Sequence, residues 1–431
     1  VETELEIKRS LSKFPVPDVI WEEYTQDQII NDRGVMVDLT LVHNAICFDY
    51  TSRSELLFRI RQITLLENPN SVKQMKEWLA QHDIEVTSLD KKQILELAKT
   101  APQEIREALL IKYKLSKNST KKYQAIQDSV CKDGRCRGMF AFYKANRTGR
   151  WAGRLVQLQN LPRNNIANLD RARELVKLGD YNAFVKEFED VTDTLSQLIR
   201  TAFISKPGTR FIVCDYSSVE ARVIAYIAKE QWRLDAFKEN QDIYCASASM
   251  IFKVPVQKHG INGHLRQSGK IAELALGYGG GVNALIAMGA LKPEYGLKEE
   301  ELSPLVKGWR EASPNIVNLW WDIDKAAFTA VKDKTCTKCH GLIFKYQSGF
   351  LFITLPSGRK LAFVKPRIGI NKFEKECITY EGIDEKKKWG RTETYGPKIT
   401  ENIVQAFSRD LLALTLIRLK DFRICMHIHD E

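Results

Sequence analysis

The sequence TRFIVCDYSSVEARVIAYIA, residues 209–228, changes its apolar pattern in the middle. The apolar run from Phe211 to Cys214 predicts a short buried strand, and the spacing of apolar residues after Ser217 predicts a helix. Asp215 then lies at the end of the strand, where side chains are commonly used for chemistry. The change from strand to helix therefore provides a first candidate site residue.

The last residues of the sequence, MHIHDE at 426–431, carry a second such carboxylate. The alternation of Met426, Ile428 and Asp430 with polar residues predicts a strand that ends at an acidic pair. If this strand and that of Asp215 were neighbours in one sheet, their carboxylates would suit two Mg²⁺ ions about 3.5–4 Å apart. Because Mg²⁺ keeps water and substrate oxygens as further ligands, two protein carboxylates can suffice. Such a pair of ions catalyses phosphoryl transfer.

The stretch RQSGKIAELALGYG, residues 266–279, predicts a helix with a charged face. Arg266, Lys270, Leu274 and Tyr278 are each four residues apart, so they line one side of the helix. Two cations at one end suit the phosphates of a nucleoside triphosphate, and the ring at the other end suits a base or sugar. The helix alone leaves open a solvated basic face with Tyr278 packed in the core.

The charge of the chain favours a polyanionic partner. The 65 basic and 54 acidic residues give a net charge of +11, and a basic surface concentrates nucleic acid near the protein. The stretch IKYKLSKNSTKKY, residues 111–123, interleaves lysines with tyrosines, a density that suits phosphate contacts. Residues 131–165 mix glycines with arginines, which allows close approach to a sugar-phosphate chain. A solvated helix face is the alternative for the lysines.

Composition excludes several classes of protein. No apolar run approaches the roughly 20 residues needed to span a bilayer, and residues 1–11 lack the pattern of a secretory signal, so we expect a cytoplasmic protein. Nine cysteines, an odd number, suit reduced thiols better than a disulfide framework. The cluster CTKCH at 336–340 resembles half a zinc site or a haem attachment signal, but no second CxxC or spaced histidine pair accompanies it. A loop leading into a strand is the favoured interpretation.

Helices are expected over most of the chain. One interruption falls at Gly34, where a turn and a short extended piece with Val35 and Val37 on one side precede a helix that starts near Asp38. Helical patterns also cover residues 70–128, 169–203 and 226–330, the last with a glycine-rich break, and residues 398–420. Residues 344–368 read as two or three strands joined by turns.

The order of these segments resembles the family A DNA polymerases, the DNA polymerase I type. DYSSVEAR at 215–222, RQSGKIAELALGYG at 266–279 and HDE at 429–431 are similar to the first palm motif, the fingers motif and the last palm motif of that family. TGRWAGRLVQLQNLPR at 148–163 is similar to a segment upstream of the palm motif. LIRTAF, DIYCASASMIF and ITENIVQAFSRDLL also match in place, so the resemblance runs from about residue 28 to the end. It is closest in character to polymerases of phages and prophages.

The resemblance implies an α+β fold with a right-hand architecture: a palm of antiparallel sheet and helices, helical fingers and a helical thumb. The expected ranges are a remnant of an upstream exonuclease-domain helix at 1–27, the base of palm and thumb at 28–65, the thumb at 66–146, the first part of the palm at 147–228, the fingers at 229–395 and the second part of the palm at 396–431. The chain is expected to be truncated at both ends. No Asp-x-Glu pair precedes the expected thumb, so it should lack proofreading.

The resemblance also assigns catalytic roles. Asp215 and Asp430 would hold two Mg²⁺ ions, for which Mn²⁺ can substitute, with the backbone carbonyl of Tyr216 as a further ligand. Glu431 would be an auxiliary carboxylate. Lys270 would neutralise the triphosphate and protonate the leaving pyrophosphate, and Arg266 would bind phosphates, in line with catalysis by positioning and charge. The nucleophile would be the primer 3'-hydroxyl.

Nucleotide selection would involve Glu220, which matches the residue beside the 2' position of the incoming sugar and so favours dNTPs over rNTPs. Tyr278 would stack near the templating base. Leu274 replaces the family's aromatic residue and Tyr244 replaces a common histidine, which predicts activity with altered nucleotide affinity. Glu401 stands where some members have asparagine.

Primer–template DNA and dNTPs are the expected partners, with phage replication proteins in addition, no membrane, and a monomeric state. The residues expected to contact DNA are Arg150, Gln159, Asn160, Arg163, Gln405, His429, Lys117, Lys121 and Lys122. Two alternatives remain: a catalytically impaired nucleic-acid-binding protein with this fold, and a single-subunit RNA polymerase or reverse transcriptase. Glu220 and the LQNLP segment disfavour the second alternative.

Overall fold

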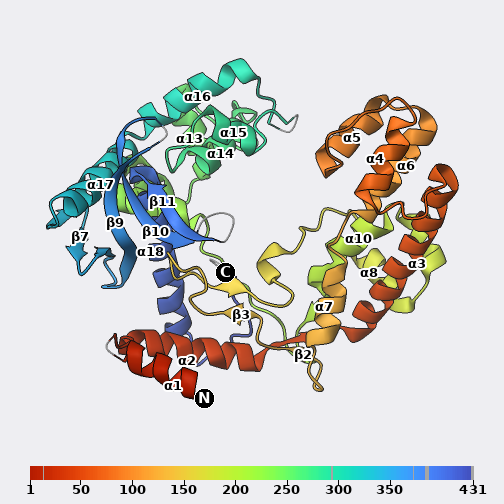
Figure 1. The fold of residues 1–431 in the computed structure, drawn as a ribbon, viewed down its shortest axis with the longest axis horizontal. Coiled ribbons are helices and arrows are strands. Elements are labelled where there is room, and N and C mark those ends of the chain that lie inside the picture. The colour runs from red at the N-terminus through yellow and green to blue at the C-terminus, as the bar shows by residue number, and fades with distance from the viewer. Residues whose placement is uncertain (13, 293–294, 372, 384–387, 429–431) are drawn as a thin grey trace. The chain divides into compact units, whose positions relative to one another are not determined.

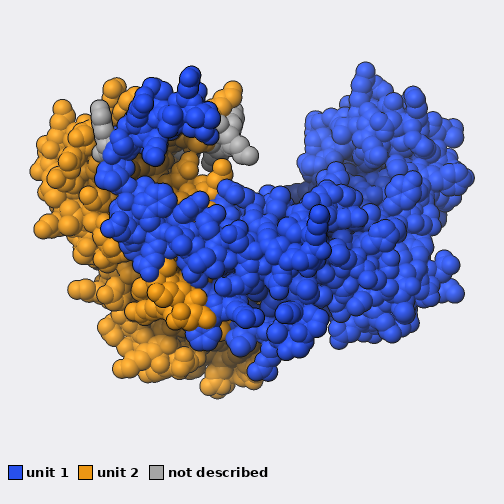
Figure 2. Space-filling model, turned by 90° about the horizontal axis from the view of Figure 1, so that it is seen from below, with its two compact units in different colours: residues 1–141, 152–213, 422–428 blue, residues 142–151, 214–421, 429–431 orange. Residues whose placement is uncertain are grey.

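The computed structural model describes residues 1–12, 14–292, 295–371, 373–383 and 388–428. The chain divides into two compact units, which Figure 2 shows in blue and orange. Unit 1 contains residues 1–141, 152–213 and 422–428, and the described residues of unit 2 are those in 142–151 and 214–421. This division is coarser than the six expected ranges, which stay predictions.

Unit 1 is mainly helical (Figure 1). Its helices are α1 (Glu2–Leu11), α2 (Asp18–Arg33), α3 (Leu39–Thr64), α4 (Val72–Ala80), α5 (Lys91–Thr100), α6 (Gln103–Leu115), α7 (Lys121–Ser129), α8 (Leu169–Leu178), α9 (Tyr181–Glu187) and α10 (Val191–Leu198), with short 3-10 turns η1 (Leu158–Asn160) and η2 (Ile199–Ala202). Its strands are β1 (Val35–Val37), β2 (Arg135–Cys136), β3 (Phe140–Ala141), β4 (Ala152–Gly153) and β5 (Phe203–Ile204).

The turn at Gly34 is as the sequence predicts. Gly34 has φ +60°, and a Cβ there would lie 2.3 Å from the carbonyl oxygen of Cys136, so only glycine fits. Val35 and Val37 are both buried, and Asp38 caps α3 by accepting a hydrogen bond from the backbone N–H of Leu41. β1 pairs antiparallel with β2 on one side and with β5 on the other.

Unit 2 combines helices with one large sheet. The helices are α11 (Val219–Ala228), α12 (Gln231–Lys238), α13 (Ile243–Phe252), α14 (Leu265–Leu276), α15 (Val282–Ala287), α16 (Glu299–Ala312), α17 (Pro314–Lys332) and α18 (Gly396–Arg418). The strands are β6 (Cys336–Cys339), β7 (Leu342–Gln347), β8 (Phe350–Thr354), β9 (Lys360–Ile370), β10 (Glu376–Ile383) and β11 (Trp389–Thr394). The six strands form an antiparallel sheet in chain order.

The sheet is larger than the two or three strands predicted, because β10 and β11 are too polar to stand out as strands by sequence. One face of the sheet packs on α17. The sheet, α17 and α18 together enclose the core of unit 2, in which Phe344, Trp320 and Ile399 are fully or almost fully buried. The cluster CTKCH is largely the strand β6 itself, not a loop leading into one. Since successive side chains of a strand alternate, Cys336 and Cys339 lie on opposite faces.

Two predicted strands are wrong. Residues 211–216 form no strand, and Ile212 and Val213 are 81% and 65% exposed. Residues 422–428, which include the described part of the strand predicted at 426–431, also lack regular structure. A strand needs the backbone groups of a neighbour, but the Arg33 side chain donates hydrogen bonds to the carbonyls of Phe422 and Ile424. No helix in the described ranges is long and apolar enough to cross a membrane.

Candidate functional site

Asp215 lies just before α11 with its side chain exposed. The next residue, Tyr216, fixes this end of the segment in two ways: its hydroxyl hydrogen-bonds with Thr415 of α18, and its carbonyl accepts from the backbone N–H of Val219 at 3.1 Å. A carbonyl has two lone pairs, so the Tyr216 oxygen can accept a second bond or ligate a cation. His429, Asp430 and Glu431 lie outside the described residues.

The segment before those three residues is held in the core of unit 1. His427 is 3% exposed, and its ring stacks on Phe140 with centroids 4.6 Å apart and planes 25° apart. Such an offset pair adds roughly 0.5–1.5 kcal/mol beyond the burial of the rings. His427 is therefore a packing residue of unit 1.

Glu220, on the first turn of α11, brings together three predicted site residues. Its Oε1 pairs with Nη2 of Arg150 at 2.5 Å, and its Oε2 accepts a hydrogen bond from the Tyr278 hydroxyl at 2.8 Å. Burial, reinforced by the negative charge of Glu220, raises the pKa of Tyr278 well above its ordinary value. Tyr278 is consequently a permanent hydrogen-bond donor, and the two bonds fix the carboxylate of Glu220 in one orientation.

The predicted charged face is present on α14. Ser268, Gly269, Ile271 and Ala272 are buried on one side, while Arg266 and Lys270 are half-buried and Leu274 is 49% exposed on the other. The helical spacing thus predicts correctly which face Arg266, Lys270 and Leu274 share, whereas Tyr278, the fourth predicted residue, lies after the end of α14 and packs against the core. This face offers two cations one turn apart and an aliphatic side chain one turn further.

Arg266 is held by residues of α13. Its Nη2 lies 2.8 Å from Oδ2 of Asp242, and its guanidinium lies 5.2 Å from the ring centroid of Tyr244. Burial opposes ionisation of Asp242, but the hydrogen bond and charge of Arg266, together with the N–H groups of Cys245 and Tyr244, outweigh it and lower the pKa of Asp242. Asp242 also caps α13 by accepting from the N–H groups of Tyr244 and Cys245. The orientation of Arg266 is therefore tied to the start of α13.

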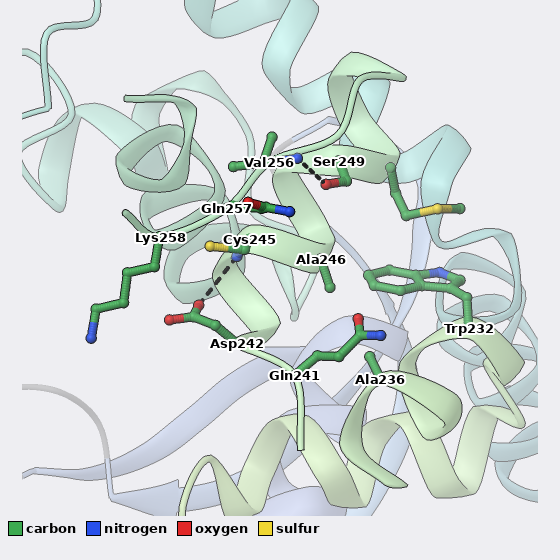
Figure 3. A pocket seen from close by; sticks show the side chains of 11 residues that line it. Trp232, Ala236, Gln241, Asp242, Cys245, Ala246, Ser249, Val256, Gln257 and Lys258 are labelled. Carbon is green, nitrogen blue, oxygen red and sulfur yellow. Dashed lines mark hydrogen bonds between the residues drawn. The ribbon is translucent and has the colours of Figure 1, made fainter. Parts of the chain in front are cut away.

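A cavity of about 500 Å³ lies beside this cap (Figure 3). It is lined by α12, by α13 and by the segment after α13, with Trp232 on one side and Lys258 on another. Asp242 therefore borders the cavity while its carboxylate is paired with Arg266.

A buried ion pair that sequence reasoning missed holds α14 in place. The guanidinium of Arg233, on α12, makes two bonds of 2.5 and 2.8 Å to the carboxylate of Glu273 on α14. Ser247 of α13 and Trp309 of α16 donate to the same carboxylate at 2.7 and 2.9 Å. The two charged side chains are 1% and 7% exposed. The sequence feature that could have indicated this ion pair is a single glutamate, Glu273, between Ala272 and Leu274 in an otherwise apolar stretch.

The backbones of α13 and α14 touch at Gly269. A Cβ at this position would lie 2.2 Å from the carbonyl oxygen of Tyr244, closer than any side chain tolerates, so glycine permits the contact. The contact lies between the Asp242–Arg266 pair and the Ser247–Glu273 bond along α14. These three ties join α13 and α14 along two turns.

The residues expected to contact DNA differ in how they are engaged. Lys117 lies 3.1 and 3.0 Å from the carboxylates of Asp190 and Asp193. Lys122 donates to the carbonyl oxygen of Val156 at 2.8 Å, whereas Lys121 is exposed. Their roles in DNA binding stay predictions.

The other expected contacts divide between the two units. Asn160 and Arg163 are exposed in unit 1, and Gln159 is half-buried there against Gly153. Gln405, in unit 2, donates to the carboxylate of Glu401 at 3.2 Å. Their contacts with DNA also stay predictions.

Comparison with known proteins identifies the family. The profile described as "DNA polymerase family A" matches residues 53–318. A DNA polymerase of Bacillus phage SP02 is 49% identical over 436 residues, which cover all of this chain and 67% of the phage protein. DNA polymerase I of Rhizobium leguminosarum is 35% identical over 118 residues, 27% of this chain and 11% of that protein.

A solved structure supports the fold. The POL domain of Pol1 from M. smegmatis, in complex with DNA primer-template and dNTP, matches with a TM-score of 0.61 and 18% identity over all of this chain and 65% of that one. The chain thus spans about two thirds of the phage protein and of the solved chain. The predicted α+β, right-hand fold is confirmed. By its profile match and its similarity to the phage enzyme along its whole length, the chain belongs to DNA polymerase family A.

Proposed function

We propose that this chain is a template-directed DNA polymerase that adds dNTPs to a primer 3'-hydroxyl and releases pyrophosphate. The observation that carries the proposal is the contact of Glu220 with Arg150 and Tyr278. Each of these residues comes from a different predicted polymerase motif, at 148–163, 215–222 and 266–279, and all three residues lie in unit 2.

Asp215 supports the metal part of the proposal. An exposed carboxylate next to a backbone carbonyl offers the hard oxygen donors that Mg²⁺ prefers. Asp215 and Asp430 would hold two Mg²⁺ ions, or Mn²⁺ in their place, with the Tyr216 carbonyl as a further ligand and Glu431 nearby. The ions would supply charge stabilisation of the transferring phosphoryl group.

The side chains of α14 would bind and orient the nucleotide. Arg266 would bind phosphate oxygens, which compete with Asp242 for the same guanidinium. Lys270 would neutralise the triphosphate and give a proton to the leaving pyrophosphate. Glu220, fixed by Arg150 and Tyr278, would exclude a 2'-hydroxyl and so select dNTPs over rNTPs. Leu274 and Tyr244 would tune nucleotide affinity.

The remaining predicted contacts complete the proposal. Primer and template would be bound by Arg150, Gln159, Asn160, Arg163, Gln405, His429, Lys121 and Lys122, whereas Lys117 would be held by Asp190 and Asp193. We place the enzyme in the cytoplasm of a bacterial host, as a monomer that works with phage replication proteins.

Primer extension with Asp215→Ala tests the function. Wild type should extend a primer with dNTPs and much more slowly with rNTPs, and Asp215→Ala should lose about 10³-fold or more in rate, since charge stabilisation of several kcal/mol is removed. Asp235→Ala, which removes an exposed carboxylate of α12, is the matched control and should extend normally. Equal synthesis by wild type and Asp215→Ala would overturn the mechanism, and a preference for rNTPs would favour an RNA polymerase.

A further inference from the structure

The six-stranded sheet of unit 2 has one face that the core does not use (Figure 1). Side chains alternate along each strand: Phe344, Leu351, Ile353 and Phe363 are buried toward α17. Their neighbours in sequence form the opposite face, which we call the outer sheet face. On β6 to β9 it consists of half-buried or exposed side chains, namely those of Cys336, Lys338, Ile343, Lys345, Gln347, Phe350, Phe352, Thr354, Lys360, Ala362 and Val364.

An aromatic pair lies at the centre of the outer sheet face. The rings of Phe350 and Phe352 are stacked, with centroids 5.5 Å apart and planes 18° apart. Lys345 stands directly opposite Phe352 on the neighbouring strand, and the ammonium of Lys360 lies 5.9 Å from the Phe352 ring centroid. Two partly exposed rings flanked by two exposed lysines thus replace the polar residues expected on a solvent-facing strand.

A basic cavity lies at the end of the β7–β8 hairpin, on the side of the sheet that packs on α17, since Val331 and Lys332 of α17 and the inward-facing Tyr346 line it. It has a volume of about 460 Å³, and its lining includes Lys332, Lys334, Lys365 and Arg367. Gly349, which also lines it, directly precedes Phe350, and its carbonyl accepts from the backbone N–H of Lys365. The cavity therefore adds positive charge near this hairpin but is not part of the outer sheet face.

Acidic residues offset only part of this charge. Glu376 pairs with Lys332 at 3.5 Å, and Glu381 pairs with Lys365 at 2.9 Å. By sequence, residues 332–394 contain 14 lysines and arginines against seven acidic residues, although the whole chain has 65 against 54. Much of the excess positive charge of the protein is therefore carried by this part of the chain.

We propose that the outer sheet face binds single-stranded DNA. Unpaired bases would stack on Phe350 and Phe352, and the backbone phosphates would contact Lys345 and Lys360. Aromatic rings on a positively charged surface are how proteins bind single strands without sequence preference, since every base has a π-face. A duplex hides those faces, and the lysines disfavour a protein partner, because lysine is depleted in protein interfaces. The site is additional to the polymerase site.

The test separates this site from the polymerase site. The chain is first saturated with a blunt DNA hairpin that occupies the polymerase site without offering a single strand. A labelled oligo-dT is then titrated in and followed by fluorescence anisotropy, beside an abasic oligonucleotide of equal length that keeps the phosphates but lacks bases. Phe350→Leu/Phe352→Leu removes the rings but keeps apolar strand residues, and Lys345→Gln/Lys360→Gln removes two charges. Lys298→Gln/Lys307→Gln, on exposed residues before and within α16, matches the change in charge.

Wild type should bind oligo-dT more tightly than the abasic strand. The leucine variant should lose about five-fold or more in affinity for oligo-dT and little for the abasic strand, because stacking is lost. In the Lys345→Gln/Lys360→Gln variant, the slope of log K against log salt should become smaller by about 1.4, because each of two lost phosphate contacts contributes about 0.7. The Lys298→Gln/Lys307→Gln control should keep the slope of wild type.

Primer extension on a template with a one-nucleotide overhang should be normal in all variants, which also shows that each is folded. Equal oligo-dT affinity for wild type and the leucine variant would overturn the proposal, as would the same salt slope for both lysine variants. If wild type failed to extend the primer, the proposed function would fall while the binding result would still decide this site. Binding of a primer–template with a long unpaired template strand is measured beside binding of separate oligo-dT. The comparison shows whether the outer sheet face binds the template strand or a second, separate single strand.

Discussion

At the scale of the residue, Glu273 explains how a basic helix face is held in position. Its carboxylate accepts hydrogen bonds from α12, α13 and α16, one of them from the guanidinium of Arg233. Burial opposes the charge of Glu273, but Arg233 together with the hydrogen bonds from Ser247 and Trp309 outweighs it, so the pKa of Glu273 is lowered. The pair is thus a fixed point among four helices, one turn from Lys270.

We expect Glu273→Gln to be strongly destabilising. The change leaves the Arg233 charge buried without its partner, which typically costs about 3–5 kcal/mol. Chemical denaturation followed by tryptophan fluorescence measures the loss, since Trp309 touches the site. Arg233→Met/Glu273→Leu should recover much of the stability, and Glu311→Gln, in an exposed pair with Lys307, should not shift the midpoint. A double variant less stable than the single one would contradict the account.

At the scale of the element, α7 shows that neighbouring lysines have different tasks. Lys121, at its first position, is exposed, whereas Lys117 just before it is 15% exposed and paired with Asp190 and Asp193. The two carboxylates raise the pKa of Lys117 although its burial lowers it. The sequence suggested one cluster of phosphate contacts, but the structure engages part of it internally.

We expect Lys121→Gln to weaken the binding of primer–template DNA and to reduce the slope of log K against log salt by about 0.9, the value for one phosphate contact on a duplex. Lys117→Gln should keep the slope but lower the thermal midpoint, because Asp190 and Asp193 lose their shared cation. Anisotropy at several salt concentrations and thermal unfolding distinguish the two. If Lys117→Gln changed the salt slope and Lys121→Gln did not, Lys117 would leave Asp190 and Asp193 to contact DNA, and the assignment would be wrong.

Helices and turns could be predicted from the sequence where residues close together in the chain determine them. The spacing of Arg266, Lys270 and Leu274 identifies a helix face, and Gly34 identifies a turn, because both depend on nearby residues. The apolar run at 211–214 also reads as a strand by itself, but strand formation depends on a distant partner. β10 and β11 were hidden for a different reason: their partners, β9 and each other, are adjacent in sequence, but the polar residues of both strands obscure the apolar alternation.

At the scale of the whole molecule, each unit contains a buried tyrosine that must stay protonated. In unit 1, Tyr123 is fully buried and donates to the carbonyl oxygen of Leu195 at 2.7 Å. In unit 2, Tyr278 donates to Glu220. Burial is the main cause that raises the pKa of both hydroxyls. Contacts of this kind join residues about 60 to 70 positions apart, so the sequence could name Tyr278 and Glu220 but not pair them.

Both units should therefore lose stability in alkali. Below pH 10 these tyrosines are protonated in the folded and the unfolded chain; above it only the unfolded chain releases the proton, so the free energy of unfolding falls as pH rises. The loss is about 1.4 kcal/mol for each pH unit and tyrosine. Urea unfolding at a series of pH values measures it. Tyr123→Phe should flatten the slope for unit 1, whereas Tyr50→Phe, on a 74% exposed residue, should not. An unchanged slope in Tyr123→Phe would contradict the assignment.

The close contact at Gly269 has a consequence for motion. With the α14 backbone against the Tyr244 carbonyl, and with Asp242 and Ser247 bonded to the same helix, neither helix can turn about its own axis without displacing the other. Any rearrangement of α14 around a nucleotide would have to carry α13 with it as one rigid body. A methyl group at position 269 would act as a wedge, and the pair would then respond to the nucleotide as two separate helices.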